Sequence, residues 1–171
     1  FAGLLMHAEH LEAVHGVSPH TISVPRIKRA DDIDPSTFAN GIDDEIFAKL
    51  VALIRIAVPY TGMIVSTRES QAVREKVLKL GISQISGGSR TSVGGYTEEE
   101  RPTDTEQFDV SDQRTLDEVV HWLMDLGYIP SFCTACYRAG RTGDRFMELC
   151  KSKQIQNCCH PNALMTLKEY L

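Results

Sequence analysis

Five cysteines lie in the last quarter of this 171-residue chain, and their spacing favours a metal site. Cys133 and Cys136 form a C-x2-C motif, which Cys159 extends to C-x2-C-x22-C. Three thiolates suit an iron–sulfur cluster and leave one coordination position open. Cys150 and one member of the Cys158–Cys159 pair are expected to be ordinary small residues, because free cysteines are among the most buried residue types.

Two other chemistries use the same residue types. A thioredoxin-like C-x-x-C follows a strand and opens a long helix near the amino end, whereas this one lies near the carboxyl end among further thiols. Cys158, Cys159 and His160 could complete a zinc site, so a zinc-stabilised binding module without catalysis is the alternative. The odd cysteine count disfavours a disulfide scaffold and favours a reducing compartment, so we expect a cytoplasmic protein.

Four of the six histidines lie within the first 20 residues. His7 and His10 are three apart and share one face of a helix. His20 immediately precedes a strand, which places it at the rim opposite the carboxyl ends of the strands. A histidine from this region could reach a metal held by the cysteines, although a structural role is more common for any single histidine.

A hydroxyl and then a guanidinium follow each of three apolar strands. In parallel α/β folds ligands bind at the carboxyl ends of strands, where arginines engage carboxylates or phosphates bidentately. The alternative is that these arginines pair with Glu69 or other acids. Such pairing could explain any single arginine, but it explains less well why the same pattern follows all three strands. The residues concerned are Ser23 and Arg26, Ser66 and Arg68, and Ser86, Ser89 and Arg90.

The elements that must position these residues alternate along the chain. Apolar spacing and caps predict helices at 3–16, 43–58, 70–81 and 115–127, and short apolar runs predict strands at 21–24, 61–67 and 82–86. Helix 43–58 is apolar over most of its circumference and should be well buried, and strand 61–67 should be covered on both faces. The last part should contain helices at 143–152 and 161–171, the second opening with Pro161 in its first turn.

This order predicts an α/β fold with parallel strands, and it fits the carboxyl half of a (β/α)8 barrel better than a three-stranded sandwich. We expect residues 1–114 to be the second half of such a barrel, with a long Gly- and acid-rich loop at 87–114. Residues 115–171 should be a mostly helical, cysteine-bearing C-terminal domain. The chain begins at Phe1 inside a helix, so we expect it to belong to a longer protein.

Composition excludes several classes of function. The net charge is −5, which offers no basic surface to nucleic acid or anionic membrane. The longest apolar run is interrupted by Arg55, so no membrane span is expected, and no signal-peptide pattern opens the chain.

Five segments together resemble the HydG family, the radical-SAM tyrosine lyases of FeFe-hydrogenase maturation. They are "HTISVPR", "AVPYTGMIVSTRES", "GISQISGGSR", "GYIPSFCTACYRAGRTGDRFMELCK" and "CCHPNALMTLKEYL". The C-x2-C-x22-C motif is the most specific part, and the first half is also similar to the thiamine-pathway tyrosine lyase. The resemblance implies a radical-SAM (β/α)8 barrel with an added C-terminal domain. The family's C-x3-C-x2-C motif, which binds the SAM-cleaving 4Fe–4S cluster, is absent here, so this chain alone is expected to be inactive.

The resemblance also implies site roles. Cys133, Cys136 and Cys159 would hold an auxiliary 4Fe–4S cluster with an additional labile iron, ligated by His10 as first choice or His20 as second. Tyrosine would be cleaved to p-cresol and dehydroglycine, and the latter would yield CO and cyanide for an iron carbonyl–cyanide synthon. The implied partners are tyrosine, S-adenosylmethionine, the amino half of the barrel and other hydrogenase maturation proteins. Tyrosine's carboxylate would bind Ser66 and Arg68, with Arg26 and Arg90 as weaker candidates for the same mouth or for SAM.

Overall fold

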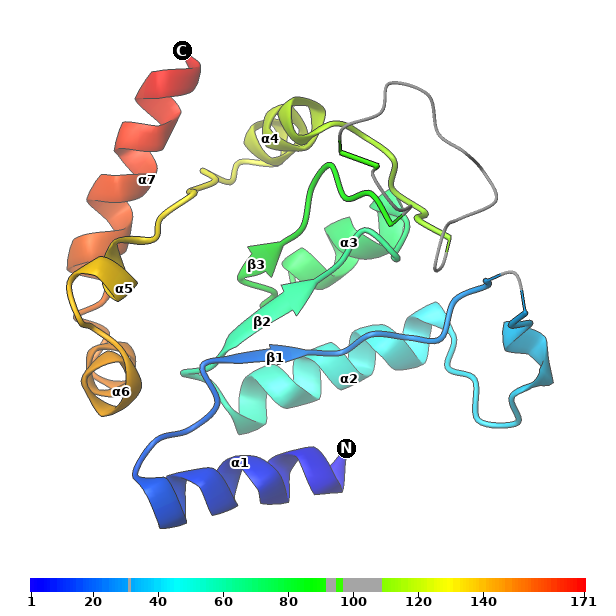
Figure 1. The fold of residues 1–171 in the computed structure, drawn as a ribbon, viewed down its shortest axis with the longest axis horizontal. Helices are drawn as coiled ribbons and strands as arrows, with labels where there is room; N and C mark the ends of the chain where they lie inside the picture. Colours follow the sequence, from blue (N-terminus) through cyan, green and yellow to red (C-terminus); the bar gives the residue numbers. More distant parts are fainter. Residues whose placement is uncertain (31, 92–94, 97–108) are drawn as a thin grey trace. The chain divides into compact units, whose positions relative to one another are not determined.

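The computed structural model describes residues 1–30, 32–91, 95–96 and 109–171 (Figure 1). By their contacts they form two compact units. The sheet unit comprises residues 22–57 and 62–116, and the cysteine unit comprises residues 1–21, 58–61 and 117–171. The division at residue 114 stays a prediction, and most of the Gly- and acid-rich loop falls outside the described residues.

Three short strands form one sheet in the order β1 (Thr21–Ser23), β2 (Gly62–Val65) and β3 (Gln84–Ile85). β2 and β3 are parallel, with Ile64 opposite Gln84 and Val65 opposite Ile85. Helices α2 (Asp44–Ala57) and α3 (Gln71–Leu78) connect the strands and contact each other. The predicted α/β class with parallel strands and connecting helices is therefore confirmed.

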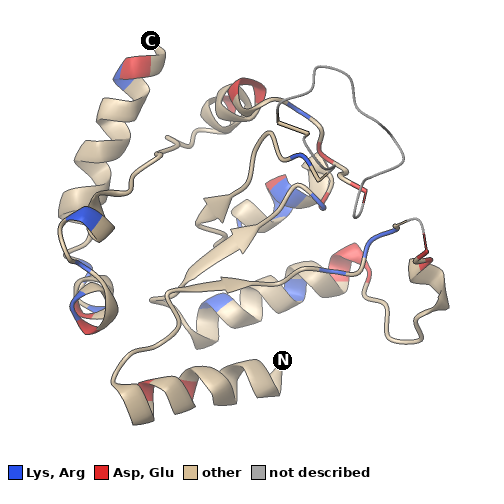
Figure 2. Ribbon diagram, in the orientation of Figure 1, with Lys and Arg blue, Asp and Glu red and all other residues tan. Residues whose placement is uncertain are grey.

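Side-chain caps set the starts of both connecting helices. The Ile46 N–H donates to the Asp43 carboxylate at 2.7 Å, and the Val73 N–H donates to the Ser70 hydroxyl at 3.4 Å. Acidic residues in the first turns of α2 and α4 also complement the helix dipole (Figure 2). α2 ends just before Pro59, since a residue that precedes proline disfavours the helical conformation.

One face of α2 and one face of β2 are fully buried in the sheet unit. The predictions of burial around most of helix 43–58 and on both faces of strand 61–67 are wrong. Ile56 is 77% exposed and Ile64 is half-buried, because α2 and α3 pack on each other and leave these sides uncovered by other parts of the unit. The buried apolar residues include Phe47, Val51, Ile54, Met63, Val65 and Val77.

The cysteine unit is helical. α1 (Ala2–His15) ends at Gly16, which adopts the left-handed conformation and donates its N–H to the Glu12 carbonyl. α4 (Leu116–Asp125), α5 (Ala135–Arg138), α6 (Gly143–Lys151) and α7 (Gln156–Tyr170) follow. Of the described helices, none has the length and apolar character that a membrane span needs.

The start of α7 differs from the prediction. The helix begins at Gln156, so Pro161 lies inside it rather than in the first turn of a helix from residue 161. The N–H groups of Cys158 and Cys159 both donate to the Ile155 carbonyl at 3.0 Å, and these bonds extend the helix ahead of the proline. The cysteine pair therefore lies on a helix, where successive side chains point about 100° apart.

Candidate substrate and cluster site

A tight turn after β2 brings two predicted substrate-binding residues together. The Glu69 N–H donates to the Ser66 carbonyl at 3.3 Å, and the Arg68 N–H donates to the Ser66 hydroxyl at 3.4 Å. Both Ser66 and Arg68 are half-buried. The turn thus holds a hydroxyl and a guanidinium two residues apart at the carboxyl end of a parallel strand.

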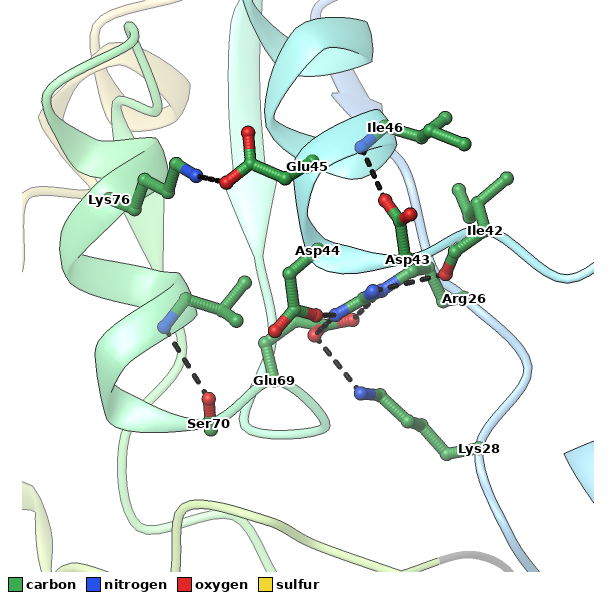
Figure 3. A network of polar contacts seen from close by, with 11 residues as sticks. Arg26, Lys28, Ile42, Asp43, Asp44, Glu45, Ile46, Glu69, Ser70 and Lys76 are labelled. Carbon is green, nitrogen blue, oxygen red and sulfur yellow. Dashed lines mark hydrogen bonds and ion pairs between the residues drawn. The ribbon is translucent and has the colours of Figure 1, made fainter.

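Arg26 is engaged in the ion pair that sequence reasoning left open as an alternative (Figure 3). Its guanidinium donates to both Glu69 carboxylate oxygens, from Nε at 2.9 Å, and pairs with Asp44 at 2.8 Å. It also donates to the Ile42 carbonyl at 3.2 Å and lies 4.6 Å from the centre of the Phe47 ring. This arginine joins the end of β1 to the starts of α2 and α3, and a role in ligand binding stays a prediction.

The electrostatics of this network favour the ionised carboxylate. Burial alone would raise the pKa of Glu69, whose side chain is 3% exposed. Hydrogen bonds and charge from Arg26 and Lys28 outweigh burial and bring the pKa below its ordinary value. The pair therefore contributes stability above the ordinary glutamate pKa, and that stability is lost as the pH falls through the lowered value.

Glu69→Gln should destabilise the sheet unit by about 2–3 kcal/mol at pH 7, because it leaves the buried Arg26 charge without its main partner. The difference from the wild type should shrink as the pH falls from the ordinary glutamate pKa through the lowered pKa of Glu69, where Glu69 itself becomes protonated. Urea unfolding at several pH values measures this. A difference that stays constant with pH would contradict the assignment to this ion pair.

Arg90 follows β3 and is half-buried. Its backbone N–H donates to the Tyr96 hydroxyl at 3.1 Å. That bond holds Tyr96 next to Arg90. The assignment of the Arg90 guanidinium to a ligand stays a prediction, as do those of Ser66 and Arg68.

A second charged network, which sequence reasoning missed, lies beyond the same strand ends. Arg74 of α3 is 0% exposed, pairs with Asp112 and donates to the Ser86 carbonyl. Arg114 donates to Asp112 at 2.8 and 2.6 Å, and the Asp112 N–H donates to the Thr67 carbonyl at 3.0 Å. The segment ahead of α4 is thereby fastened to the ends of β2 and β3.

Burial opposes both charges of this pair. It lowers the pKa of the Arg74 guanidinium, although Asp112 partly compensates. Burial would raise the pKa of Asp112, but hydrogen bonds from Arg114 and the charge of Arg74 bring it below its ordinary value. Each charge therefore helps to offset the cost of burying the other, and Arg114 adds to this for Asp112. The sequence did not indicate this pair because Arg74 and Asp112 lie far apart along the chain. A single Arg on a helix and a single Asp in a loop are usually solvated.

The cysteine unit gathers the thiols singled out from spacing. Cys133 and Cys159 are exposed and Cys136 is half-buried. Burial and then the charges of Cys136, Cys133 and Cys158 raise the pKa of Cys159, so these four thiols lie close enough to interact. In the described part of the chain no three His, Cys, Asp or Glu side chains converge on one point as a metal would need. The donor set itself fits an iron–sulfur cluster, whose ligands are thiolates.

The other two cysteines have different surroundings. Cys150 is half-buried on α6, and burial is the main reason that its pKa is raised. Cys158 lines a pocket of about 810 Å³ together with Arg141 and Arg145. The backbone N–H of Arg141 donates to the Cys136 carbonyl at 2.9 Å. A separate hydrogen bond with the Cys136 side chain raises the pKa of the Arg141 guanidinium.

The two candidate histidines have different neighbours. His20 stacks on Phe146 of α6 with ring centres 4.4 Å apart, and its ring lies 6.3 Å from that of Tyr137, the neighbour of Cys136. Its Nδ1 lies 2.9 Å from the Thr21 hydroxyl. His10 lies on α1, and both histidines are exposed. His20, the second choice from sequence, therefore lies beside the cysteine-bearing helices.

Comparison with known proteins defines the class. Residues 23–129 match the Biotin and Thiamin Synthesis associated domain, and the chain belongs to this family. It is also 30% identical over 129 residues to 2-iminoacetate synthase of Escherichia coli, an alignment that covers 73% of this chain and 33% of that protein. This match supports the predicted similarity to the thiamine-pathway tyrosine lyase.

Two solved structures of HydG are similar to the chain. A crystal structure of HydG, described as a maturase of the FeFe-hydrogenase, has a TM-score of 0.89 and 57% identity, covering 96% of this chain and 35% of that one. HydG from Carboxydothermus hydrogenoformans has a TM-score of 0.73 and 44% identity, covering 98% of this chain and 34% of that one. The predicted resemblance to HydG is confirmed, and the chain spans about one third of these relatives.

Proposed function

We propose that this chain is the carboxyl-terminal portion of a radical-SAM tyrosine lyase of the HydG type. The observation that carries the proposal is the 57% identity to a HydG maturase over 96% of the chain. In this proposal the sheet unit belongs to the second half of a (β/α)8 barrel, and the remaining barrel strands come from outside these residues. The exposed thiols suit the reducing cytoplasm.

The whole enzyme would cleave tyrosine to p-cresol and dehydroglycine, form CO and cyanide, and supply an iron carbonyl–cyanide unit for the FeFe-hydrogenase active-site cluster. SAM and its 4Fe–4S cluster would be held mainly by residues outside this chain. Arg68 would bind the tyrosine carboxylate with two parallel N–H groups, and Ser66 would add a hydroxyl donor. Fixing the carboxylate orients the amino acid before its bonds are broken.

Cys133, Cys136 and Cys159 would hold the auxiliary cluster, and His20 would ligate the labile iron. When bound, the cluster would supply iron for the capture of CO and cyanide. Its ligands in this chain must be deprotonated, and the His20 Nδ1 contact to Thr21 leaves Nε2 as the coordinating nitrogen. The stacking of His20 on Phe146 supports this assignment over His10.

Arg68→Ala in the full-length enzyme should weaken tyrosine binding about tenfold or more, because a charge-assisted pair to the substrate carboxylate is lost. Isothermal titration with tyrosine measures the affinity, and p-cresol formation reports turnover. Arg29→Ala removes the same charge from an exposed position and should bind tyrosine normally. Unchanged tyrosine affinity in Arg68→Ala would refute the carboxylate role.

A further inference from the structure

One carboxylate in the cysteine unit receives hydrogen bonds from three other segments. The Ser18 hydroxyl donates to Glu12 at 2.7 Å, the Tyr60 hydroxyl donates to it at 2.8 Å, and the Lys151 ammonium pairs with it. Lys151 Nζ also lies 4.8 Å from the centre of the Tyr60 ring. The network joins α1, the residues before β1, the residues before β2 and α6.

The hydrogen bonds of this network stabilise the ionised form of Glu12. Hydrogen bonds from Lys151, Ser18 and Tyr60 lower its pKa from 4.5 to about 2. Ser18 is only 3% exposed, so its hydroxyl is held away from competing water. An isolated surface ion pair contributes little, but several donors on one acceptor fix a geometry more firmly than a pair does.

The same segments meet a second time at His20. The Thr61 hydroxyl donates to the Pro19 carbonyl at 3.1 Å, which fixes the backbone between Ser18 and His20. The His20 ring then stacks on Phe146, which lies on α6 as Lys151 does. The residues before β1 are therefore tied to α6 at two places, one of which is the candidate iron ligand.

We propose that Glu12, Ser18, Tyr60 and Lys151 form a positioning network that holds His20 over α6, beside the cysteine-bearing segment. The role of His20 as an iron ligand rests on the proposed function, whereas the positioning of its ring does not. Metal-binding histidines depend on surrounding groups for their orientation, and loss of such groups typically costs about 10–100-fold in metal affinity. None of the four residues is a ligand of the iron in this proposal, so they act through His20.

The test uses charge reversal in the full-length protein. Glu12→Lys and Lys151→Glu each place like charges together, and the double variant restores an opposite pair. Carbethoxylation of His20 by diethyl pyrocarbonate, followed by mass spectrometry of its peptide in the metal-free protein, measures how well the ring is held. Each single variant should raise the rate about threefold, in keeping with the modest strength of an exposed ion pair, and the double variant should return it to the wild-type rate. Labile iron, counted after reconstitution, should be lost in parallel.

His10 is an internal control, because it lies on α1 beside Glu12 but outside the network, and its rate should not change. Tyr60→Phe removes only a hydroxyl and tests the proposal if a charge reversal prevents folding. An unchanged His20 rate in all of these variants would overturn the positioning network. A faster His20 reaction with normal iron content would support the network and refute His20 as the iron ligand.

Discussion

Replacing Cys133, Cys136 or Cys159 by alanine should abolish the auxiliary iron–sulfur cluster of the full-length protein. Each is one of three proposed thiolate ligands, and a cluster with an open position has no spare ligand to replace a lost one. The charges of Cys136, Cys133 and Cys158 all act on Cys159, so these thiols lie near one another, and which of them are ligands stays a prediction. Iron and sulfide analysis after anaerobic reconstitution, with EPR spectroscopy, should show the SAM-binding cluster alone.

The chain contains two matched controls for this prediction. Cys158→Ala changes the residue next to Cys159, and Cys150→Ala removes a half-buried thiol on α6. Both should keep the auxiliary cluster. If the cluster is lost in Cys158→Ala and kept in Cys159→Ala, then Cys158 and not Cys159 is the third ligand. About one zinc per chain and no auxiliary iron in the wild type would favour the zinc-stabilised module instead.

Local signals predicted the elements well. Asp43, Ser70 and Gly16 cap helices at ends that the sequence predicted, since each acts through backbone groups within four residues of itself. Burial was predicted less well. The sequence shows that Ile56 lies on an apolar face of its helix. It does not show whether another element covers that face, because such packing depends on residues far away in the sequence.

The same division holds for the candidate site. C-x2-C spacing and the hydroxyl–guanidinium pairs are visible in the sequence because their members are neighbours. The contact of His20 with Phe146 was not visible, since it spans 126 residues and follows from how the helices pack, and the choice between His10 and His20 stays a prediction. The helix start predicted at Pro161 was wrong for a related reason. Proline is common in the first turn of helices, but here hydrogen bonds to the Ile155 carbonyl extend the helix ahead of it.

Asp112→Ala should lower the free energy of unfolding of the sheet unit by about 3–5 kcal/mol, the usual cost of leaving a buried charge without its partner. Arg74 is 0% exposed, so removal of Asp112 leaves its guanidinium buried without a carboxylate partner. The variant also loses the carboxylate that Arg114 binds. Hydrogen exchange of the β2 and α3 amides measures the effect locally, without requiring the whole enzyme to unfold in one step.

Two further variants separate charge from packing. Arg114→Ala removes the partner that is 20% exposed and should cost only about 1 kcal/mol, because Asp112 keeps Arg74. Arg74→Met combined with Asp112→Leu removes both charges, so it should be milder than Asp112→Ala alone. Exchange protection that falls equally in the double variant and in Asp112→Ala would show that the segment ahead of α4 is held by packing and not by this ion pair. The predicted result is a larger loss of protection in Asp112→Ala than in the double variant. It would show that the Arg74–Asp112 pair holds this segment at the ends of β2 and β3, next to the turn that carries Ser66 and Arg68.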